Sequence, residues 1–397
     1  MSLENKQILL GVTGGIAAYK TAELTRLLIK AGAFVRVVMT RGAQAFVTPL
    51  TFQALSGEPV RTELLDPEHE AAMGHIELAR WADLILIAPA TANFIERLAT
   101  GRADDLLSTL CLASASPIML APAMNQQMWK QQATQDNIKI LQQRDINIIG
   151  PAEGDQACGD IGPGRMLEPQ EILSQAEQHF HTGALACKQI LITAGPTREP
   201  IDPVRFLSNR SSGKMGYALA QAAVEAGATV TLVSGPVVLA TPRGVKKVSV
   251  ETAEEMYSTV LENINHADIF IATAAVSDYR PAMTATQKIK KSSDNFTLEL
   301  QPNPDILAEV AALETPPFTV GFAAETESLE NHAQEKLKRK KLDMIAANPV
   351  NNHQGFDQNE NQLTVFWSDG KQHFPLTSKH KIARQLLNLI AEKYHSK

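Results

Sequence analysis

The sequence has little cysteine and no long hydrophobic run. Its three cysteines, Cys111, Cys158 and Cys187, are widely spaced in 397 residues, with no C-x-x-C pair and no histidine at zinc-ligand spacing. Neither a disulfide framework nor a structural metal site is therefore expected. No apolar run reaches 18 residues, and the first residues lack the hydrophobic segment of a secretory signal, so we expect a cytoplasmic protein without membrane partners.

Two common nucleotide-binding signatures are also missing. The first glycine turn, residues 11–15, is not G-x-G-x-x-G, and no acidic residue ends the second predicted strand, which disfavours an NAD-dependent dehydrogenase. Residues 212–215 resemble the end of a Walker A motif, but Ser208 stands where its first glycine belongs and Met215 replaces the magnesium-binding Ser or Thr. The net charge of −6 disfavours a dedicated nucleic-acid-binding protein.

The hydrophobic pattern predicts two α/β halves of similar design. With 44% apolar and 20% charged residues, the chain is long enough for two or three domains of ordinary size. A strand at 7–12, a helix at 16–30 and a strand at 34–39 open the first half, and a strand at 189–195 and a helix at 217–226 repeat this order. We therefore expect α/β architecture with two doubly wound, Rossmann-like parallel sheets.

The boundary between the halves is expected near residue 186. Residues 172–188 indicate a terminal helix with a short linker, because the strand pattern restarts only at Gln189. The predicted domains are residues 1–186 and 187–397. In open parallel sheets, ligands bind at the loops that follow the strands.

Two strand-end loops of the first half fit parts of a flavin. The amides of Thr13, Gly14 and Gly15 precede a helix, where a phosphate can bind, although this segment is equally explained as a tight turn that packs the helix on the sheet. Residues 89–93 combine small side chains, which admit a flat ring, with a hydroxyl and an amide. Together the two loops would suit flavin mononucleotide (FMN).

Three residues of the first half are candidate catalytic groups. Cys158 lies among the glycines and proline of residues 156–166, which favours a shaped loop that presents an acid or nucleophile over a buried, inert thiol. A lone histidine such as His75 is more often a helix cap or a surface residue. Asn125 is likewise an ordinary strand-end residue unless a partner lies nearby.

The second half carries basic residues on several strand-end loops. Lys336 and Lys340 are four residues apart on one predicted helix face and could bind a triphosphate together, although charge runs usually mark a solvated face. Lys288 begins a second basic cluster, and the loop at 274–278 ends in the carboxylate of Asp278. This combination favours a nucleoside triphosphate with magnesium.

These motifs, in this order, resemble a known family of bifunctional enzymes. The first half resembles phosphopantothenoylcysteine decarboxylase, and the second phosphopantothenate–cysteine ligase, of coenzyme A biosynthesis. The motifs that carry the resemblance are residues 13–20, 74–75, 122–125 and 157–160 in the first half and residues 194–199, 208–216, 274–278, 288–290 and 321–325 in the second. Thr13 departs from the serine common in the family but keeps the hydroxyl.

For the second half, the resemblance implies a CTP-dependent ligase. It would activate the carboxylate of 4′-phosphopantothenate as an acyl-cytidylate, releasing pyrophosphate, and the amine of cysteine would then displace CMP. Asn209 and Lys288 would be catalytic, Arg205 and Asn209 would contact the substrate, and Mg²⁺ would accompany CTP on unknown ligands. The implied CTP residues are Ala272, Thr273, Ala274, Asp278, Lys288, Asn303, Pro304, Asp305, Ile306, Phe322, Lys336 and Lys340.

For the first half, the resemblance implies a flavoprotein fold and an FMN-dependent decarboxylase. FMN would transiently accept a hydride from the carbon beside sulfur, so that loss of carbon dioxide leaves an enethiolate. Cys158 would protonate the enethiolate, His75 would act in oxidation and decarboxylation, and Asn125 would hold the substrate. The implied FMN residues are Thr13, Gly14, Gly15, Thr40, Ala90, Thr91 and Ser108.

The resemblance also implies a homo-oligomer, with trimers of the decarboxylase domain joined through ligase dimers. Two other functions stay open at this point. One is a flavin-dependent decarboxylase of peptidyl cysteine, which the second half disfavours. The other is a non-catalytic regulatory protein with the flavin fold, which the presence of His75 and Cys158 disfavours.

Overall fold

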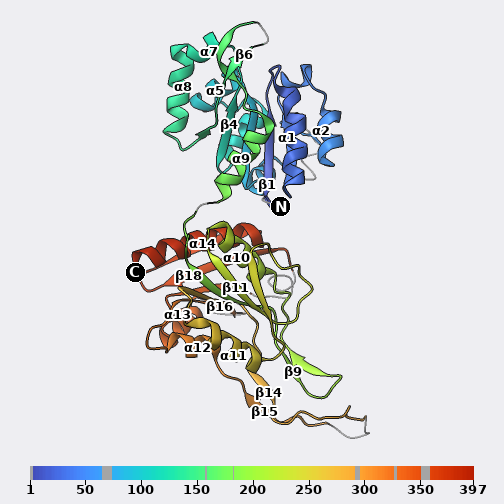
Figure 1. Ribbon diagram of the computed structural model, residues 1–397, viewed down its shortest axis with the longest axis vertical. Helices are drawn as coiled ribbons and strands as arrows, with labels where there is room; N and C mark the ends of the chain where they lie inside the picture. The colour runs from blue at the N-terminus through green and yellow to red at the C-terminus, as the bar shows by residue number, and fades with distance from the viewer. Residues whose placement is uncertain are drawn as a thin grey trace. The chain divides into compact units, whose positions relative to one another are not determined.

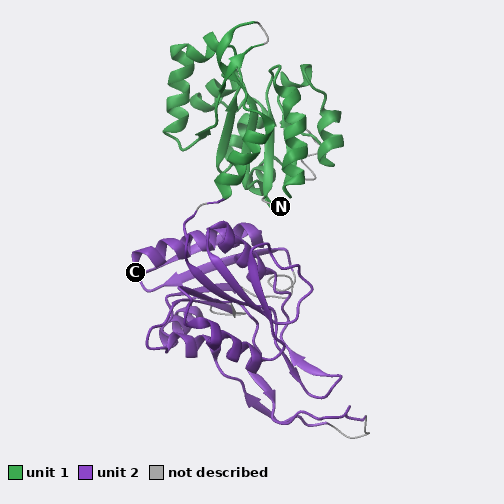
Figure 2. Ribbon diagram, viewed as in Figure 1, with its two compact units in different colours: residues 1–180 green, residues 181–397 purple. Residues whose placement is uncertain are grey.

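Each half of the chain forms an α/β unit of its own, and Figure 2 shows the two in different colours. The computed structural model describes residues 3–64, 74–156, 159–181, 183–290, 296–325, 329–349 and 358–397. Unit 1 comprises residues 1–180 and unit 2 residues 181–397. The predicted α/β class with a parallel sheet in each half is confirmed, whereas the domain boundary near residue 186 stays a prediction.

Unit 1 is built on a five-stranded parallel sheet of order β2-β1-β3-β4-β5. Its strands are β1 (Gln7–Val12), β2 (Phe34–Met39), β3 (Leu84–Ala90), β4 (Ile118–Pro122) and β5 (Asn147–Ile148). The strands predicted at 7–12 and 34–39 have the predicted bounds. They are easy to locate because both faces of the sheet are covered, so the strands are continuous apolar runs.

Helices cover both faces of this sheet (Figure 1). On one face, Leu24, Phe52 and Ile172 of α1, α2 and α9 pack in a cluster with Ile8 and Leu10 of β1, whereas Leu9 belongs to the cluster on the other face. The helices are α1 (Ala18–Lys30), α2 (Pro49–Ser56), α4 (His75–Trp81), α5 (Ala92–Thr100), α6 (Leu106–Ala113), α7 (Gln126–Lys130), α8 (Gln132–Gln142) and α9 (Pro169–Phe180), with a 3₁₀ turn at Ala43–Ala45.

Two local features of unit 1 differ from the predicted helices. Helix α1 begins at Ala18 rather than Ile16, because the turn after β1 uses hydrogen bonds from Gly15 N to Thr13 O and from Ala18 N to Gly15 O. Helix α9 ends at Phe180. A hairpin of β6 (Ala152–Asp155) and β7 (Ile161–Arg165) precedes α9 and forms a separate two-stranded sheet.

Unit 2 has an eight-stranded sheet of order β12-β11-β8-β13-β16-β17-β18-β19. The first six strands in this order pair in parallel, whereas β18 and β19 are antiparallel and form a hairpin at one edge. The strands are β8 (Gln189–Ala194), β11 (Thr229–Ser234), β12 (Val245–Ser249), β13 (Ile269–Ala272), β16 (Phe318–Glu325), β17 (Met344–Pro349), β18 (Glu360–Trp367) and β19 (Gly370–Ser378). The antiparallel edge is an addition to the predicted parallel sheet.

The helices of unit 2 also lie on both faces of the sheet. Helices α10 (Lys214–Glu225) and α14 (Lys379–Ser396) pack in one cluster. Helices α11 (Ala253–Ile264), α12 (Ile306–Ala311) and α13 (Leu329–Arg339) pack in the clusters of the other face. Two short ribbons, β9 (Arg198–Pro200) with β10 (Phe206–Ser208) and β14 (Tyr279–Pro281) with β15 (Leu300–Pro302), extend away from the sheet (Figure 1).

Among the described residues of both units, no helix combines the length and the apolar composition needed to cross a membrane.

Candidate active sites

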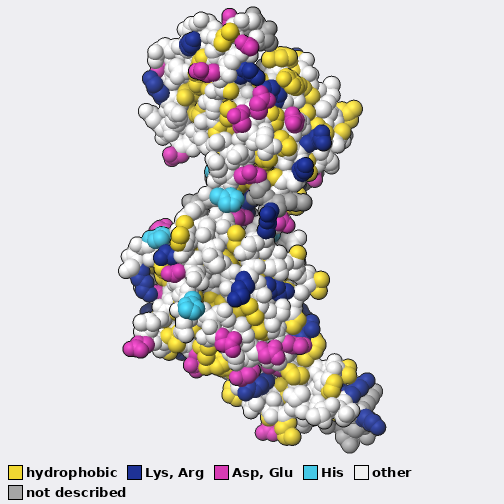
Figure 3. All heavy atoms as spheres, viewed as in Figure 1, with side chains coloured by type: hydrophobic (Ala, Val, Ile, Leu, Met, Phe, Trp, Pro, Cys, Tyr) yellow, Lys and Arg dark blue, Asp and Glu magenta, His cyan; other side chains and the backbone are white. Residues whose placement is uncertain are grey.

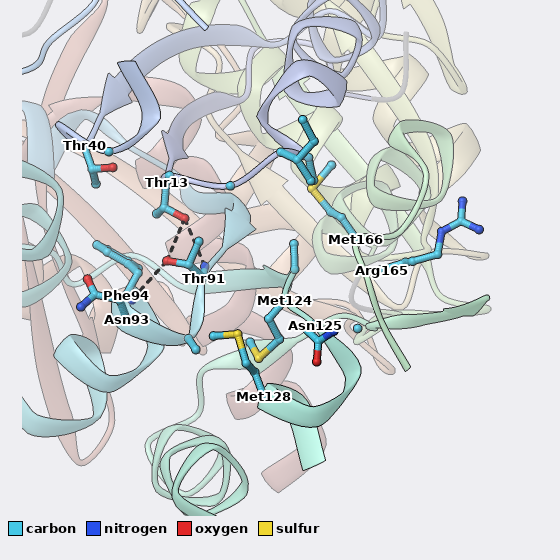
Figure 4. Close-up of a pocket in the computed structure, with 18 of the residues that line it drawn as sticks. Thr13, Thr40, Thr91, Asn93, Phe94, Met124, Asn125, Met128, Arg165 and Met166 are labelled. Atoms are coloured by element: carbon cyan, nitrogen blue, oxygen red, sulfur yellow. Dashed lines mark hydrogen bonds between the residues drawn. The ribbon is translucent and has the colours of Figure 1, made fainter. Parts of the chain in front are cut away.

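Unit 1 contains a cavity of about 960 Å³ at the carboxyl ends of its parallel strands. Figure 4 shows its walls, which come from the loops after β1, β2, β3 and β4 and from the β6–β7 hairpin. Of the implied flavin residues, those that line the cavity are Thr13, Gly14, Gly15, Thr40 and Thr91. Ala90 and Ser108 are fully buried and do not line it.

Hydrogen bonds of Thr13 join the expected phosphate loop to the expected ring loop. Its hydroxyl donates to Pro89 O at 2.7 Å and accepts from the backbone N–H of Thr91 at 3.1 Å. Thr91 in turn caps α5 by accepting from Phe94 N at 3.4 Å. The two loops that were predicted to fit separate parts of a flavin therefore lie side by side in one cavity (Figure 4).

The phosphate loop approaches a second glycine so closely that no side chain fits between them. A Cβ atom added to Gly14 would lie 2.7 Å from the carbonyl carbon of Gly42. Gly42 and its neighbour Arg41 also line the cavity. Because Gly42 follows a different strand, sequence analysis did not associate it with Gly14.

Ser108 does not line the cavity but forms hydrogen bonds with Asp105, which does. Its backbone N–H donates to Asp105 Oδ1 at 2.8 Å, and its hydroxyl oxygen accepts from Asp105 N at 3.2 Å, which together form a capping box at the start of α6. Asp105 itself lines the cavity and pairs with Arg97 at 2.8 Å. Ser108 thus orients a carboxylate of the cavity wall.

Arg97 also pairs with Asp104, at 2.9 Å. Asp104 is exposed, and the loss of hydration near its neighbours works against its ionisation, but the hydrogen bond from Arg102 and the charges of Arg97 and Arg102 outweigh that effect and lower its pKa. The cavity therefore has one wall with an ionised acidic and basic network, which the sequence did not reveal because Arg97 lies on an ordinary amphipathic helix.

Asn125 lies where the β4 loop meets the β6–β7 hairpin. Its amide nitrogen donates to Asp160 Oδ2 at 2.8 Å and to Gln156 Oε1 at 3.4 Å. The hairpin also docks through a hydrogen bond from Met124 N to Gly164 O, at 2.9 Å. Cys158 lies outside the described residues, but residues that flank it in sequence, Gln156 and Asp160, both bond to Asn125.

His75 is the first residue of α4, after Gly74, and is half-buried. It does not line the unit 1 cavity. The structure thus brings Asn125 together with the two loops that were expected to bind a flavin, but not with His75.

Several apolar side chains in the cavity were missed by sequence analysis. Phe94, Met124, Met128 and Met166 also line the cavity, with Phe94 beside Thr91 and with Met124 and Met128 near Asn125 (Figure 4). Methionine adapts well to flat aromatic ligands, but single methionines in a sequence carry no signal for such a site.

Unit 2 contains a second cavity, of about 770 Å³, between the strand ends and the start of α10. Asn209 lines it, and so do most of the implied CTP residues, which are Ala272, Thr273, Ala274, Asp278, Asn303, Pro304, Asp305, Ile306, Phe322 and Lys340. These residues come from four separate segments of the chain. The predicted convergence of strand-end loops is therefore observed.

The polar residues of this wall hold one another in place. Lys340 pairs with Asp305 at 2.6 Å, and Asp305 caps α12 by accepting from Ala308 N at 3.1 Å. Asn303 donates to Ser277 O and accepts from Arg280, both at 2.8 Å. These contacts fix a carboxylate and an ammonium at the mouth of the strands, where a charged ligand can meet both.

Asn209 faces the neighbouring strand-end loop. Its amide nitrogen donates to Val276 O at 3.0 Å, while its backbone lies in the loop before α10. This hydrogen bond fixes the direction of the side chain across the cavity.

Three implied residues, Arg205, Lys288 and Lys336, do not line the described cavity. Lys336 lies on α13 one turn before Lys340. Lys288 is exposed on the segment between β14 and β15. Arg205 donates to Asp202 at 2.7 Å and to Ile289 O at 2.6 Å, so it ties the β9–β10 turn to the segment that carries Lys288.

We call the contacts of Asp202 with Arg205 and with the segment around Ile289 the Asp202 clamp. Burial works against its ionisation, but hydrogen bonds from the amides of Val204, Ile289 and Arg205, and from the Arg205 side chain, outweigh that effect and lower the pKa of Asp202 to about 2. The carboxylate therefore stays ionised throughout the neutral range. The cluster of hydrogen-bonding partners could not be foreseen because Ile289 is far from Asp202 in sequence.

Within the described parts of the chain, no cluster of three or more histidine, cysteine, aspartate or glutamate side chains is arranged to hold a metal ion.

Comparisons with known proteins match both units. Residues 1–181 match the model of the flavoprotein family, which indicates a flavin cofactor for unit 1, and residues 185–394 match the model described as the DNA/pantothenate metabolism flavoprotein C-terminal domain.

Three curated relatives cover the chain from end to end, and all are named coenzyme A biosynthesis bifunctional protein CoaBC. The Vibrio cholerae protein is 58% identical over 395 residues, covering 98% of this chain and 99% of its own. The Escherichia coli protein is 54% identical over 403 residues (100% and 99%), and the Bacillus subtilis protein is 48% identical over 395 residues (98% and 97%). The chain belongs to the family of coenzyme A biosynthesis bifunctional proteins.

Proposed function

We propose that the chain catalyses two successive reactions of coenzyme A biosynthesis. Unit 2 joins cysteine to 4′-phosphopantothenate, and unit 1 decarboxylates the product to 4′-phosphopantetheine. The observation that supports this most strongly is the pair of chemically different strand-end cavities in a chain whose relatives are bifunctional over its full length.

In the ligase reaction, unit 2 activates the carboxylate of 4′-phosphopantothenate, so that CMP, a good leaving group, departs in place of an oxygen of the free acid. An oxygen of the substrate carboxylate attacks the α-phosphorus of CTP, the bond to the β-phosphate oxygen breaks, and pyrophosphate departs. The amine of cysteine then attacks the acyl carbon and displaces CMP. Negative charge develops on phosphate oxygens during the first step, so positioned cations lower its barrier. Lys340 lines the cavity for this purpose, with Lys288 and Lys336 as further candidates.

The remaining cavity residues orient the substrates. Phe322 and residues 272–274 lie beside the base and ribose, Asp278 and residues 303–306 complete the nucleotide wall, and Asn209 donates to the substrate being activated. Arg205 contacts the phosphate or carboxylate of 4′-phosphopantothenate. Mg²⁺ enters with CTP, because this ion keeps several waters and binds through substrate phosphates with few protein ligands.

The residues of unit 1 fit FMN. Gly14 and Gly15 carry no side chain that would block the amides of the turn before α1, Gly14 lies against Gly42, and a helix N-terminus binds phosphate. Phe94 and the three methionines provide an apolar wall for a flat ring. Ala90 and Ser108 are buried outside the cavity lining, and Ser108 acts on the cavity through its hydrogen bonds to Asp105. When bound, FMN supplies a reversible acceptor for a hydride.

The residues around the flavin site bind and protonate the substrate. Asn125 holds the carboxylate or amide of phosphopantothenoylcysteine, next to the segment that carries Cys158. Cys158 supplies the proton that completes the product thiol, and His75 serves the oxidation and decarboxylation steps.

We further propose that the protein is a cytoplasmic homo-oligomer in which copies complete one another's sites. His75, Arg205 and Lys288 lie outside the cavity of their own unit. Exposed apolar side chains lie around α1 and α2 in unit 1, where Ile16 and Tyr19 also line the cavity, and on the ribbons of unit 2 (Figure 3). They include Ile16, Tyr19, Phe46 and Leu50 in unit 1 and Val204, Phe206, Tyr279, Met283, Phe296 and Leu300 in unit 2. Trimers of unit 1 joined through dimers of unit 2 would cover both groups.

One reaction tests the proposed function. The purified protein is incubated with 4′-phosphopantothenate, cysteine, CTP and Mg²⁺, the products are analysed by mass spectrometry, and the visible spectrum of the protein is recorded. A flavin spectrum together with 4′-phosphopantetheine supports both halves. Accumulation of phosphopantothenoylcysteine would refute the decarboxylase role, and absence of both pyrophosphate and product would refute the ligase role.

A further inference from the structure

Unit 2 contains a further cavity, of about 600 Å³, to which the proposed reactions give no role. It lies between the C-terminal part of α13 and the turn that joins β18 to β19, and we call it the α13 cavity. It shares no lining residue with the cavity that holds the implied CTP residues. Its volume is typical of a small-molecule site, so it is a candidate binding site of its own.

One face of α13 and of the turn that ends it lines the α13 cavity. Gln334 is followed by Leu337, Lys338 and Lys341 at three, four and seven residues, a spacing that places side chains on one side of a helix. Lys340, in contrast, lines the cavity of the implied CTP residues. The lysine run of this segment therefore serves two cavities, and CTP binding does not account for Lys338 and Lys341.

The lining of the α13 cavity is positively charged. Lys371, from the start of β19, joins Lys338 and Lys341, and none of the described lining residues is acidic, although the chain has a net charge of −6. Glu330 pairs with Lys371 at 2.8 Å from outside the lining. Both side chains of this pair are more than half exposed, and such a pair is weak. The three ammonium groups therefore favour an anionic ligand.

Apolar side chains complete the lining of the α13 cavity. They are Leu337 and Leu342, both buried, and the half-buried Trp367. A Cβ atom added to Gly370 would lie 2.7 Å from Cζ2 of Trp367, so this glycine lets the hairpin turn lie against the indole ring. The ammonium of Lys393 lies 4.5 Å from the ring centre. A flat apolar group gains from contact with a tryptophan and two leucines.

Lys341 occupies a position where glycine would fit better. The chain leaves α13 through a left-handed residue, with a φ of 53° at Lys341, and the N–H of Leu342 donates to Leu337 O at 3.0 Å. Glycine is preferred at the left-handed position of such a helix end, because a Cβ atom costs energy there. The lysine side chain thus brings no advantage to the turn itself, whereas it adds a cation to the cavity.

We propose that the α13 cavity binds a phosphorylated small molecule that carries an aromatic ring, such as a nucleoside monophosphate. The phosphate contacts Lys338, Lys341 and Lys371, and the ring packs against Trp367 and the two leucines. Lysine binds phosphate as a compact point charge, and here three ammonium groups reach one cavity from two elements of the fold. The site is separate from the cavities of the proposed function, so the two can be tested independently.

Pyridoxal 5′-phosphate is the probe, because it combines an aromatic ring and a phosphate with an aldehyde that forms an imine with a lysine amine. The full-length protein is incubated with it, the imines are reduced with borohydride, and peptide mass spectrometry identifies the labelled lysines. We expect labelling of Lys338, Lys341 or Lys371 to exceed that of Lys139 roughly tenfold; Lys139 is 65% exposed and lines none of the three cavities. AMP should prevent the labelling at a roughly tenfold lower concentration than inorganic phosphate, which makes no contact with Trp367.

Lys341→Gly separates binding from stability. Because glycine suits the left-handed position, the variant should unfold at a temperature no lower than the wild type, while labelling of Lys338 and Lys371 falls roughly tenfold. If it does not fold, Lys371→Gln replaces it, with labelling of Lys338 and Lys341 as the readout. Lys246→Gln, an exposed lysine of β12 outside this cavity, is the matched control and should leave the labelling unchanged. Labelling no higher than at Lys139, equal protection by AMP and inorganic phosphate, or unchanged labelling in the folded variant would each overturn the inference.

Discussion

The two units place a cavity at the carboxyl ends of the strands of a similar sheet and line it with different sets of side chains. In unit 1 the cavity has an apolar wall that includes Phe94 and Met128, and its charged groups are largely paired with one another. In unit 2 it is lined by Arg210, Lys214, Lys340 and Lys379. The parallel sheet thus determines where a ligand binds, and the loops and helix starts determine which ligand it is.

This contrast fits the chemistry proposed for each unit. A flavin presents a flat ring, which gains from apolar contact over a wide area. A nucleoside triphosphate presents several negative charges close together, which gain from cations and helix N-termini. Changes at one cavity should therefore affect one reaction and spare the other.

The largest expected effect comes from Gly14→Ala. Its new methyl group would lie 2.7 Å from the Gly42 backbone, so the loops after β1 and β2 must move apart. Overpacking of this kind costs about 1–3 kcal/mol, which at its upper end weakens flavin binding roughly a hundredfold. We expect the purified variant to contain little flavin, measured by its visible absorbance, while CTP-dependent release of pyrophosphate is retained.

Gly15→Ala is the matched comparison. The same methyl group at Gly15 would lie 3.5 Å from Thr91 Cγ2, an ordinary contact, so flavin loss should be smaller. Equal flavin content in Gly14→Ala and the wild type would show that the close approach to Gly42 does not shape the site.

Lys340→Ala should slow the ligase reaction of unit 2 and leave flavin binding in unit 1 intact. Loss of a charge-assisted contact to phosphate lowers kcat/KM for CTP by roughly tenfold, with no change in flavin content. The ion pair with Asp305 is partly exposed, so its loss should reduce the free energy of unfolding by no more than about 1 kcal/mol. Lys338→Ala removes a nearby lysine of α13 that does not line this cavity and should leave both reactions unchanged; an equal loss in the two variants would contradict the assignment.

Sequence analysis located the parts of both sites that lie directly after parallel strands. Residues 13–15 and 272–278 could be found because an apolar run ending at glycine or small residues is a local pattern, and the carboxyl ends of parallel strands meet at one edge. Asn303 and Phe322, which the family resemblance implied, also line the unit 2 cavity. For these segments, order along the chain was enough to predict proximity in space.

The residues that sequence analysis missed lie on helices and strands whose hydrophobic pattern gives no sign of a ligand site. Lys379 begins an amphipathic helix near the end of the chain, and only the packing of α14 beside α10 brings it to the cavity. Arg97 and Met128 likewise lie on helices that reach the unit 1 cavity through tertiary packing. The antiparallel β18–β19 edge was missed because β19 is mostly polar and exposed and buries only Phe374, so it lacks the apolar run of the parallel strands.

A smaller effect is expected at the clamp of Asp202 in unit 2. Its folded pKa, about 2, lies below the usual unfolded value of about 3.9. A carboxyl group with a lowered pKa stabilises the fold above its unfolded pKa and loses that contribution as the pH falls through the folded value. Asp202→Asn should therefore destabilise the protein at pH 5, and its difference from the wild type should shrink between pH 4 and pH 2.

Thermal unfolding of both proteins at several acidic pH values measures this difference. The flavin signal of unit 1 should be the same in both at pH 7, because the clamp belongs to unit 2. A difference in stability that stays constant from pH 5 to pH 2 would mean that ionisation of Asp202 does not hold the β9–β10 turn to the segment around Ile289.

The smallest effect is expected from alkylation of the two described cysteines, which have opposite environments in the two units. Cys111 is 7% exposed in α6, and burial, with a contribution from the charge of Asp105, raises the pKa of its thiol. Cys187 is exposed at the start of unit 2. Because the thiolate is the reactive form and needs access to the reagent, iodoacetamide at pH 8 should modify Cys187 in the folded protein and Cys111 only after unfolding. Peptide mass spectrometry in the Cys158→Ser background separates the two sites, and early modification of Cys111 would mean that the packing of α6 beside the flavin cavity opens in the native state.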